Sequence, residues 1–210
     1  MIEHFMEQTE FSSYEDFMSN FKVNVPKDFN FGYDVIDRYA AEQPEKDALV
    51  WVNDRGAKEY VTYRGLKNIS DQCAAFLQGI GVKRGDRVML ILKRRLEWWY
   101  TMLALHKLGA VAIPATHMLT DKDIIYRCHM AGISCIVACG DPIVVNHVQK
   151  ARRYCPTIRH CISIGPNVPN GWYDYWRGLH EADPFEVPER NKVTDNFLLY
   201  FTSGTTGEPK

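Results

Sequence analysis

The chain has 210 residues, and its 25 Lys and Arg residues nearly balance its 26 Asp and Glu residues. At roughly 150 residues per domain, this length predicts one large domain or a domain and a half, which can fold without disulfides or a structural metal. The net charge of −1 gives no global electrostatic reason to bind nucleic acid, and a hydrophobic content of 46% argues against disorder.

Short apolar strands alternate with helical patterns along most of the chain. Residues 48–53 (ALVWVN) and 59–62 predict two strands joined by a turn, and Thr62 is placed to cap a helix that runs to about Ile80. The later strand-type runs are 87–92, 111–114, 133–139, 160–164 and 196–201. The helical patterns between them are 96–108, 120–130, 142–154 and 172–182. Thr120 heads the pattern 120–130, and Asp123 is placed to support its first turn.

Apolar strands that are separated by helices predict an α/β fold, with a mostly parallel sheet flanked by helices on both faces. We expect residues 1–30 to form a peripheral arm, with a short helix after Ser12 and Ser13. Residues 31–195 are expected to form the α/β subdomain. Residues 196–210 are expected to form a strand and a phosphate-binding loop at which the chain is cut short.

The beginning of the chain lacks the basic region and apolar run of a secretory signal. The most apolar stretch, 98–115, contains His106, Lys107 and Pro114, and is too short and too interrupted for a membrane span. The six cysteines have no C-x2-C pairing typical of zinc sites, so we expect reduced, mostly buried thiols. The sequence therefore predicts a cytoplasmic protein with no membrane span and no partner nucleic acid.

The segment 200–210, YFTSGTTGEPK, begins at the end of the last predicted strand and continues beyond it. Its glycines allow the backbone to approach a ligand closely, and consecutive N–H groups in such a turn favour anions. The four hydroxyl residues and Lys210 add donors and a positive charge. The carboxyl end of a strand is also where open α/β sheets bind ligands. The segment predicts polyphosphate binding; an ordinary polar surface loop is the alternative.

Two better-known phosphate-binding patterns do not fit this loop. A Walker loop needs four residues between its glycines, whereas Gly204 and Gly207 are separated by two. The dinucleotide pattern G-x-G-x-x-G is absent from the chain. A different class of nucleotide-binding protein is therefore indicated.

TSGTTGEPK (202–210) resembles the signature loop of the adenylate-forming enzymes, which include acyl-CoA synthetases, peptide-synthetase adenylation domains and firefly-type luciferases. VTYRGL (61–66) and LHKLGAVAIPAT (105–116) are similar to two other family segments, and the resemblance covers roughly 31–210. Gly65 stands where an acidic residue is common, which weakens the first turn of its helix slightly. The run 87–119 most resembles synthetases of the acetate to medium-chain fatty-acid type.

The resemblance implies a two-step reaction with ATP, Mg²⁺ and coenzyme A. A small carboxylic acid attacks the α-phosphorus to give acyl-adenylate and pyrophosphate, and the thiol of coenzyme A then displaces AMP. The residues implied to hold the ATP phosphates are Thr202, Ser203, Gly204, Thr205, Thr206, Gly207, Glu208, Pro209 and Lys210. The resemblance assigns no catalytic residue or metal ligand to this chain. We therefore expect an N-terminal fragment of a synthetase that is inactive by itself.

Other residues have two interpretations each. His117 is a candidate coenzyme A contact, or else a structural or surface histidine. The cluster 93–95 (Lys-Arg-Arg) either attracts the coenzyme's phosphates or forms a solvated turn. Trp98 and Trp99 either line an acyl pocket or, as we expect, pack in the core.

Apolar surface left by the truncation favours a homodimer. Two alternative functions remain open: a peptide-synthetase adenylation domain and a non-catalytic nucleotide-binding module.

Overall fold

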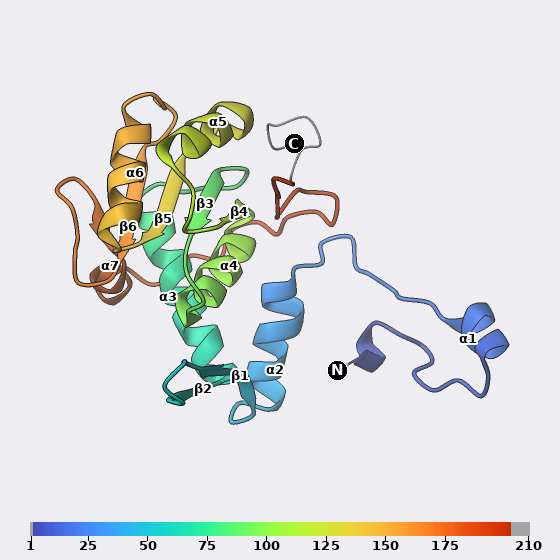
Figure 1. The fold of residues 1–210 in the computed structure, drawn as a ribbon. Helices are drawn as coiled ribbons and strands as arrows, with labels where there is room; N and C mark the ends of the chain where they lie inside the picture. The colour runs from blue at the N-terminus through green and yellow to red at the C-terminus, as the bar shows by residue number, and fades with distance from the viewer. Residues whose placement is uncertain (1, 203–210) are drawn as a thin grey trace.

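A computed structural model describes residues 2–202, and a five-stranded parallel sheet forms its centre (Figure 1). The strand order is β4-β3-β5-β6-β7, and each neighbouring pair is parallel. The strands are β3 (Arg87–Ile91), β4 (Val111–Ala115), β5 (Cys135–Cys139), β6 (His160–Ile164) and β7 (Tyr173–Asp174). The predicted α/β fold with a parallel sheet is confirmed.

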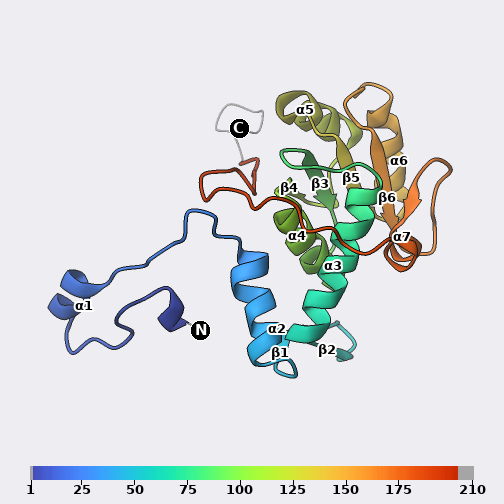
Figure 2. The same cartoon turned by 180° about the vertical axis from the view of Figure 1, so that it is seen from behind.

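Helices cover both faces of this sheet (Figures 1 and 2). On one face α3 (Tyr63–Gly79) packs against α4 (Leu96–Leu108) and α7 (Tyr175–Glu181). On the other face α5 (Asp121–Ala131) packs against α6 (Pro142–Arg152). The chain passes from β3 to β4 on one side of β3 and then crosses to β5 on the other side. Right-handed crossovers therefore place α4 and α5 on opposite faces.

The helix starts follow the predicted caps. The hydroxyl of Thr62 accepts a hydrogen bond of 3.1 Å from the backbone N–H of Gly65 at the start of α3. At the start of α5, Thr120 and Asp123 form a reciprocal capping box, in which each side chain accepts from the other's backbone N–H. Gly109 ends α4 with a φ of +69°, which favours glycine over residues with a Cβ.

The predicted strand 196–201 is wrong in extent, because the segment makes only an isolated parallel bridge between Leu198 and Ala112 of β4. The Ala112 N–H donates to the Phe197 carbonyl at 2.9 Å, and the Ala112 carbonyl accepts from the Leu199 N–H at 3.0 Å. The next residue of β4 that faces this segment is Pro114, which has no N–H to donate. The ladder therefore stops after one residue.

Two other elements differ from the sequence prediction. A helix at 32–42 was not predicted; it begins as a π-helix (Gly32–Asp37) and continues as α2 (Arg38–Glu42). The sequence did carry a start signal that was missed: the Asn30 side chain accepts from the Gly32 N–H at 3.0 Å, and Asp34 accepts from the Asn30 N–H at 2.7 Å. The predicted helix 172–182 is shorter, because its first residues form β7 instead.

A hairpin of β1 (Asp47–Val52) and β2 (Lys58–Thr62) lies at the N-terminal end of α3. It packs against the π-helix Gly32–Asp37, α3 and α4 through a second, smaller apolar cluster, centred on Ile36, Leu66, Leu96, Tyr100 and Leu103. This cluster joins the hairpin and the π-helix to the main body.

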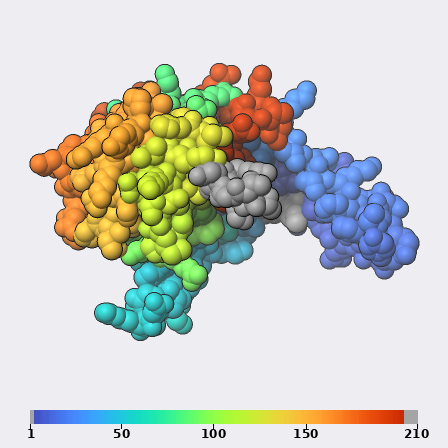
Figure 3. Space-filling model, turned by 45° about the horizontal axis from the view of Figure 1, so that its top comes forward, coloured from blue at the N-terminus to red at the C-terminus, as the bar shows by residue number. Residues whose placement is uncertain are grey.

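The N-terminal segment forms a hairpin-like arm that projects from the rest of the molecule (Figures 1 and 3). It contains a short 3-10 helix (Ile2–His4) and α1 (Tyr14–Asn20), which the Ser13 side chain caps as predicted. A bridge between Met6 and Val23 closes the arm on itself. No residue of α1 is buried.

The ammonium group of Lys107 is fully buried and joins three helical segments. Its Nζ lies 2.7 Å from Oδ1 of Asp37, 2.5 Å from Oδ1 of Asp71, and 3.2 Å from the hydroxyl of Ser70. Gly32 lies so close that an added Cβ would be 2.9 Å from Lys107 Cγ. The ion cluster therefore fixes α4 to the segment before α2 and to α3.

All six cysteines are buried free thiols, as expected. Among residues 2–202, no helix has both the length and the apolar character required to cross a bilayer.

Replacing Lys107 by Met is predicted to lower the free energy of unfolding by about 3–5 kcal/mol, because two carboxylates lose their buried cation. Urea denaturation at pH 7 measures this change. Lys122→Met is the matched control, because it replaces the same type of side chain at an exposed position of α5. Equal, small effects of the two substitutions would show that the buried cluster does not stabilise the fold.

Candidate functional site

The carboxyl ends of β3, β4, β5 and β6 lie at one edge of the sheet, and the strand order reverses between β3 and β5. Doubly wound sheets bind ligands at such a switch point. Here the loops after β3 and β5 are joined by an ion pair of 2.9 Å between Lys93 Nζ and Asp141 Oδ2. The Lys93 ammonium holds the pKa of Asp141 below its usual range.

The basic cluster 93–95 is thus partly neutralised by partners within the chain. Arg95 Nε lies 3.0 Å from Glu97 Oε2, and its Nη1 donates to the Ile164 carbonyl at 3.2 Å. Lys93 pairs with Asp141, and Arg94 is exposed. The arrangement supports the interpretation as a strand-to-helix turn, and attraction of a coenzyme phosphate stays a prediction.

The segment 197–202 runs beside β4 and reaches the same edge. Its pairing with Ala112 sets its direction parallel to β4, so Thr202 follows at the carboxyl end of the sheet. Thr202 is exposed. The other predicted phosphate-binding residues, Ser203 to Lys210, lie outside the described residues, and their roles stay predictions.

Two aromatic side chains of this segment contact helices on opposite faces of the sheet. The ring of Phe197 stacks on His106 of α4, with ring centroids 4.7 Å apart and planes inclined by 19°. The ring of Phe201 faces the guanidinium of Arg127 on α5, at 5.2 Å from the ring centroid. Sequence reasoning missed both contacts, because no spacing rule relates residues so far apart along the chain.

The stacked imidazole of His106 is nearly buried, with 9% of the residue exposed. Burial lowers the pKa of His106 to about 4, while the charge of Asp34 acts in the opposite direction. The ring is therefore neutral at pH 7. Phe197 stacks on a neutral aromatic ring.

His117 lies in an exposed turn directly after β4, where the sequence placed it. The turn is closed locally by a hydrogen bond of 3.3 Å from the Met118 N–H to the Thr116 hydroxyl. His117 therefore lies at the carboxyl edge of the sheet, where doubly wound folds bind ligands. A contact with coenzyme A stays a prediction.

Trp98 and Trp99 line an apolar pocket of about 340 Å³ between α4, the base of the arm and segment 191–197. Trp98 is half-buried and packs on the main core, but Trp99 is 49% exposed. The expectation of core packing is thus wrong for Trp99, because its side of α4 faces away from the sheet. Phe29, Phe31 and Phe197 supply other walls of the pocket.

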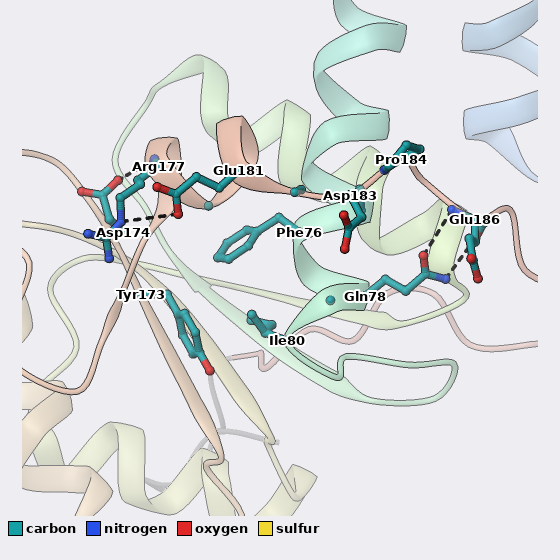
Figure 4. A pocket seen from close by; sticks show the side chains of 14 residues that line it. Phe76, Gln78, Ile80, Tyr173, Asp174, Arg177, Glu181, Asp183, Pro184 and Glu186 are labelled. Carbon is teal, nitrogen blue, oxygen red and sulfur yellow. Dashed lines mark hydrogen bonds and ion pairs between the residues drawn. The ribbon is translucent and has the colours of Figure 1, made fainter.

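A second pocket, of about 460 Å³, lies between the C-terminal turns of α3 and α7 (Figure 4). Phe76 and Tyr173 form apolar walls, and an added Cβ on Gly178 would lie 2.4 Å from the Phe76 ring. The charged lining residues are Arg177 and the carboxylates Asp174, Glu181, Asp183 and Glu186. This acidic lining repels polyphosphates and makes the pocket unsuitable for ATP.

Within the part of the chain that the structure describes, no group of three His, Cys, Asp or Glu side chains is placed to hold a metal ion.

Residues 36–210 match the family model described as "AMP-binding enzyme". The chain belongs to this family.

Curated relatives are acyl-coenzyme A synthetases. The chain is 35% identical over 195 residues to mitochondrial acyl-coenzyme A synthetase ACSM5 of Rattus norvegicus. The aligned residues cover 90% of this chain and 33% of that protein. It is 32% identical over 206 residues to mitochondrial acyl-coenzyme A synthetase ACSM3 of Homo sapiens, covering 95% of this chain and 35% of that protein. The chain thus spans about a third of the length of these relatives.

Solved structures share the fold. The anthranilate CoA ligase AuaEII, in complex with anthranoyl-AMP, superposes with a TM-score of 0.78 at 24% identity, over 89% of this chain and 34% of the ligase. Acetoacetyl-CoA synthetase from Streptomyces lividans gives 0.77 at 24% identity, over 87% of this chain and 29% of that synthetase.

The pH dependence of folding is predicted to contain a contribution from His106. Its pKa is near 4 when folded and near 6.5 when unfolded, so the unfolded chain binds more protons between these values. The stability from the neutral ring is complete above about pH 6.5 and is lost as pH falls towards 4. His106→Phe keeps an aromatic ring without the proton site.

Between pH 7 and pH 4 the wild type should lose about 3 kcal/mol more unfolding free energy than His106→Phe. Urea denaturation of both chains across this range measures the difference. Parallel stability curves would contradict the buried, neutral state of His106.

Proposed function

We propose that this chain is the N-terminal part of an ATP-dependent acyl-CoA synthetase, which converts a carboxylic acid, ATP and coenzyme A into acyl-CoA, AMP and pyrophosphate. The observation that carries the proposal is the sequence of 202–210, which follows a segment that runs parallel to β4 in an AMP-binding family chain. The names of the curated relatives favour a synthetase over a peptide-synthetase adenylation domain.

In this reaction a carboxylate oxygen attacks the α-phosphorus of ATP and pyrophosphate leaves. The backbone N–H groups and hydroxyls of Thr202 to Gly207 hold the β- and γ-phosphates, with Glu208 and Pro209 leading to Lys210. Lys210 offsets the negative charge that grows on the leaving group, which is electrostatic catalysis by groups already in place. Bound Mg²⁺ would share this charge, and it commonly binds through substrate phosphates and one or two carboxylates.

The second step uses coenzyme A, whose thiol attacks the acyl carbonyl and displaces AMP. His117 is proposed to contact coenzyme A, since it lies in an exposed turn at the carboxyl edge of the sheet. The proposed organisation is an arm at 1–30, an α/β subdomain at 31–195 and the phosphate-binding segment at 196–210. The proposed compartment is the cytoplasm, although the two relatives described above are named as mitochondrial. Homodimer formation is also a proposal.

A panel of carboxylic acids tests the function in a longer protein that carries this sequence. We expect AMP release that requires both an acid, from acetate to medium-chain fatty acids, and coenzyme A. Amino-acid-dependent exchange of pyrophosphate into ATP, without any response to coenzyme A, would instead identify an adenylation domain. No turnover with any acid would indicate a non-catalytic nucleotide-binding module. The 210-residue chain alone is expected to give no exchange above background.

Lys210→Ala in the longer protein is predicted to lower kcat/KM for ATP by about 10²–10³-fold, because charge stabilisation of the departing pyrophosphate is lost. Initial rates of AMP release measure this effect. Lys58→Ala is the matched control, since Lys58 is exposed on β2. Activity close to wild type in Lys210→Ala would remove the assigned role of the loop lysine.

A further inference from the structure

We propose that Arg127 is a positioning residue for the phosphate-binding loop, because its guanidinium holds the ring of Phe201 immediately before the loop begins at Thr202. The inference rests on the proposed function for its effect on ATP, but the contact itself belongs to this chain. No sequence motif indicates this role for Arg127.

The backbone pairing of this segment with β4 is short. Ala112 of β4 exchanges backbone hydrogen bonds with Phe197 and Leu199, and Pro114 has no N–H to donate the next one. After Leu199 no strand pairing continues towards the loop. The Phe201 side chain adds a further attachment, since it is half-buried against the main core and its ring faces the guanidinium of Arg127.

Arg127 is suited to this task because it is itself fixed. Its side chain is only 13% exposed, and its Nη1 donates to the Asp123 carbonyl at 3.0 Å. Asp123 is held in turn by the capping box, where the Thr120 hydroxyl donates to its carboxylate at 2.7 Å. The first turn of α5 therefore holds the cation, and the cation holds the ring.

The strength of the contact sets the expected effect. A cation over an aromatic ring stabilises by an amount that corresponds to about a two- to five-fold change in an equilibrium. When the contact is removed, part of the free energy of ATP binding is used to order the residues before the loop, so the observed affinity falls. ATP phosphates bind in the ground state as well as in the transition state, so KM for ATP should change more than kcat.

The first experiment observes the ring directly in the 210-residue chain. 4-Fluorophenylalanine is placed at position 201 and followed by ¹⁹F NMR in wild type, Arg127→Gln, Arg127→Lys and the control Lys122→Gln on the same helix. We expect Arg127→Gln to move the resonance towards its position in the urea-unfolded chain, Arg127→Lys to move it less, and Lys122→Gln to leave it unchanged. An unchanged resonance in Arg127→Gln, in a chain whose circular dichroism shows it is folded, overturns the proposal.

The second experiment is a double-mutant cycle in the longer protein, with Arg127→Gln, Phe201→Leu and both together. Each single substitution should raise KM for ATP about two- to five-fold, and the double substitution should add little to the larger single effect. Fully additive effects contradict the proposal. If the wild type shows no turnover, the proposed function fails, while the fluorine result still decides the contact.

Discussion

The arrangement of this chain depends on one buried ammonium group. Lys107 is fully removed from solvent and requires the carboxylates of Asp37 and Asp71, which lie on different helical segments. An unpaired charge at this depth would cost several kcal/mol, so the segments must meet where the cation lies. The end of α4 is then completed by Asn30, which donates to the His106 carbonyl at 2.8 Å, and by Tyr33, which donates to the Lys107 carbonyl at 3.2 Å.

The fixed end of α4 also determines where segment 197–202 runs. His106, next to Lys107, presents its neutral ring to Phe197, while β4 pairs with the same segment through Ala112. Arg127 then contacts Phe201 from the opposite face of the sheet. Contacts from two helix layers and one strand therefore bring Thr202 to the carboxyl edge. These contacts supplement the single bridge between the segment and β4, whereas a regular ladder would fix the segment through its backbone alone.

Local signals in the sequence were sufficient for most of the fold. Thr62 and Thr120 marked helix starts, and apolar runs marked the parallel strands, because caps and burial patterns act over a few residues. The signature loop indicated the family for the same reason. The partners of Lys107 and Arg127 were not predictable, since tertiary packing alone brings together residues that are far apart in the chain. The short pairing of 196–201 did carry a signal, Pro114, whose missing N–H limits the ladder on that side of β4.

Transfer of oxygen from the acid to AMP tests the central claim, an acyl-adenylate reaction, most directly. The longer protein is incubated with ATP, coenzyme A and a carboxylic acid labelled with ¹⁸O in both carboxylate oxygens. Mass spectrometry then measures the ¹⁸O content of AMP and pyrophosphate. Attack of the carboxylate on the α-phosphorus, followed by cleavage of the acyl C–O bond by the thiol, leaves one ¹⁸O in AMP and none in pyrophosphate. Label in inorganic phosphate, or unlabelled AMP formed together with acyl-CoA, would contradict an adenylate intermediate.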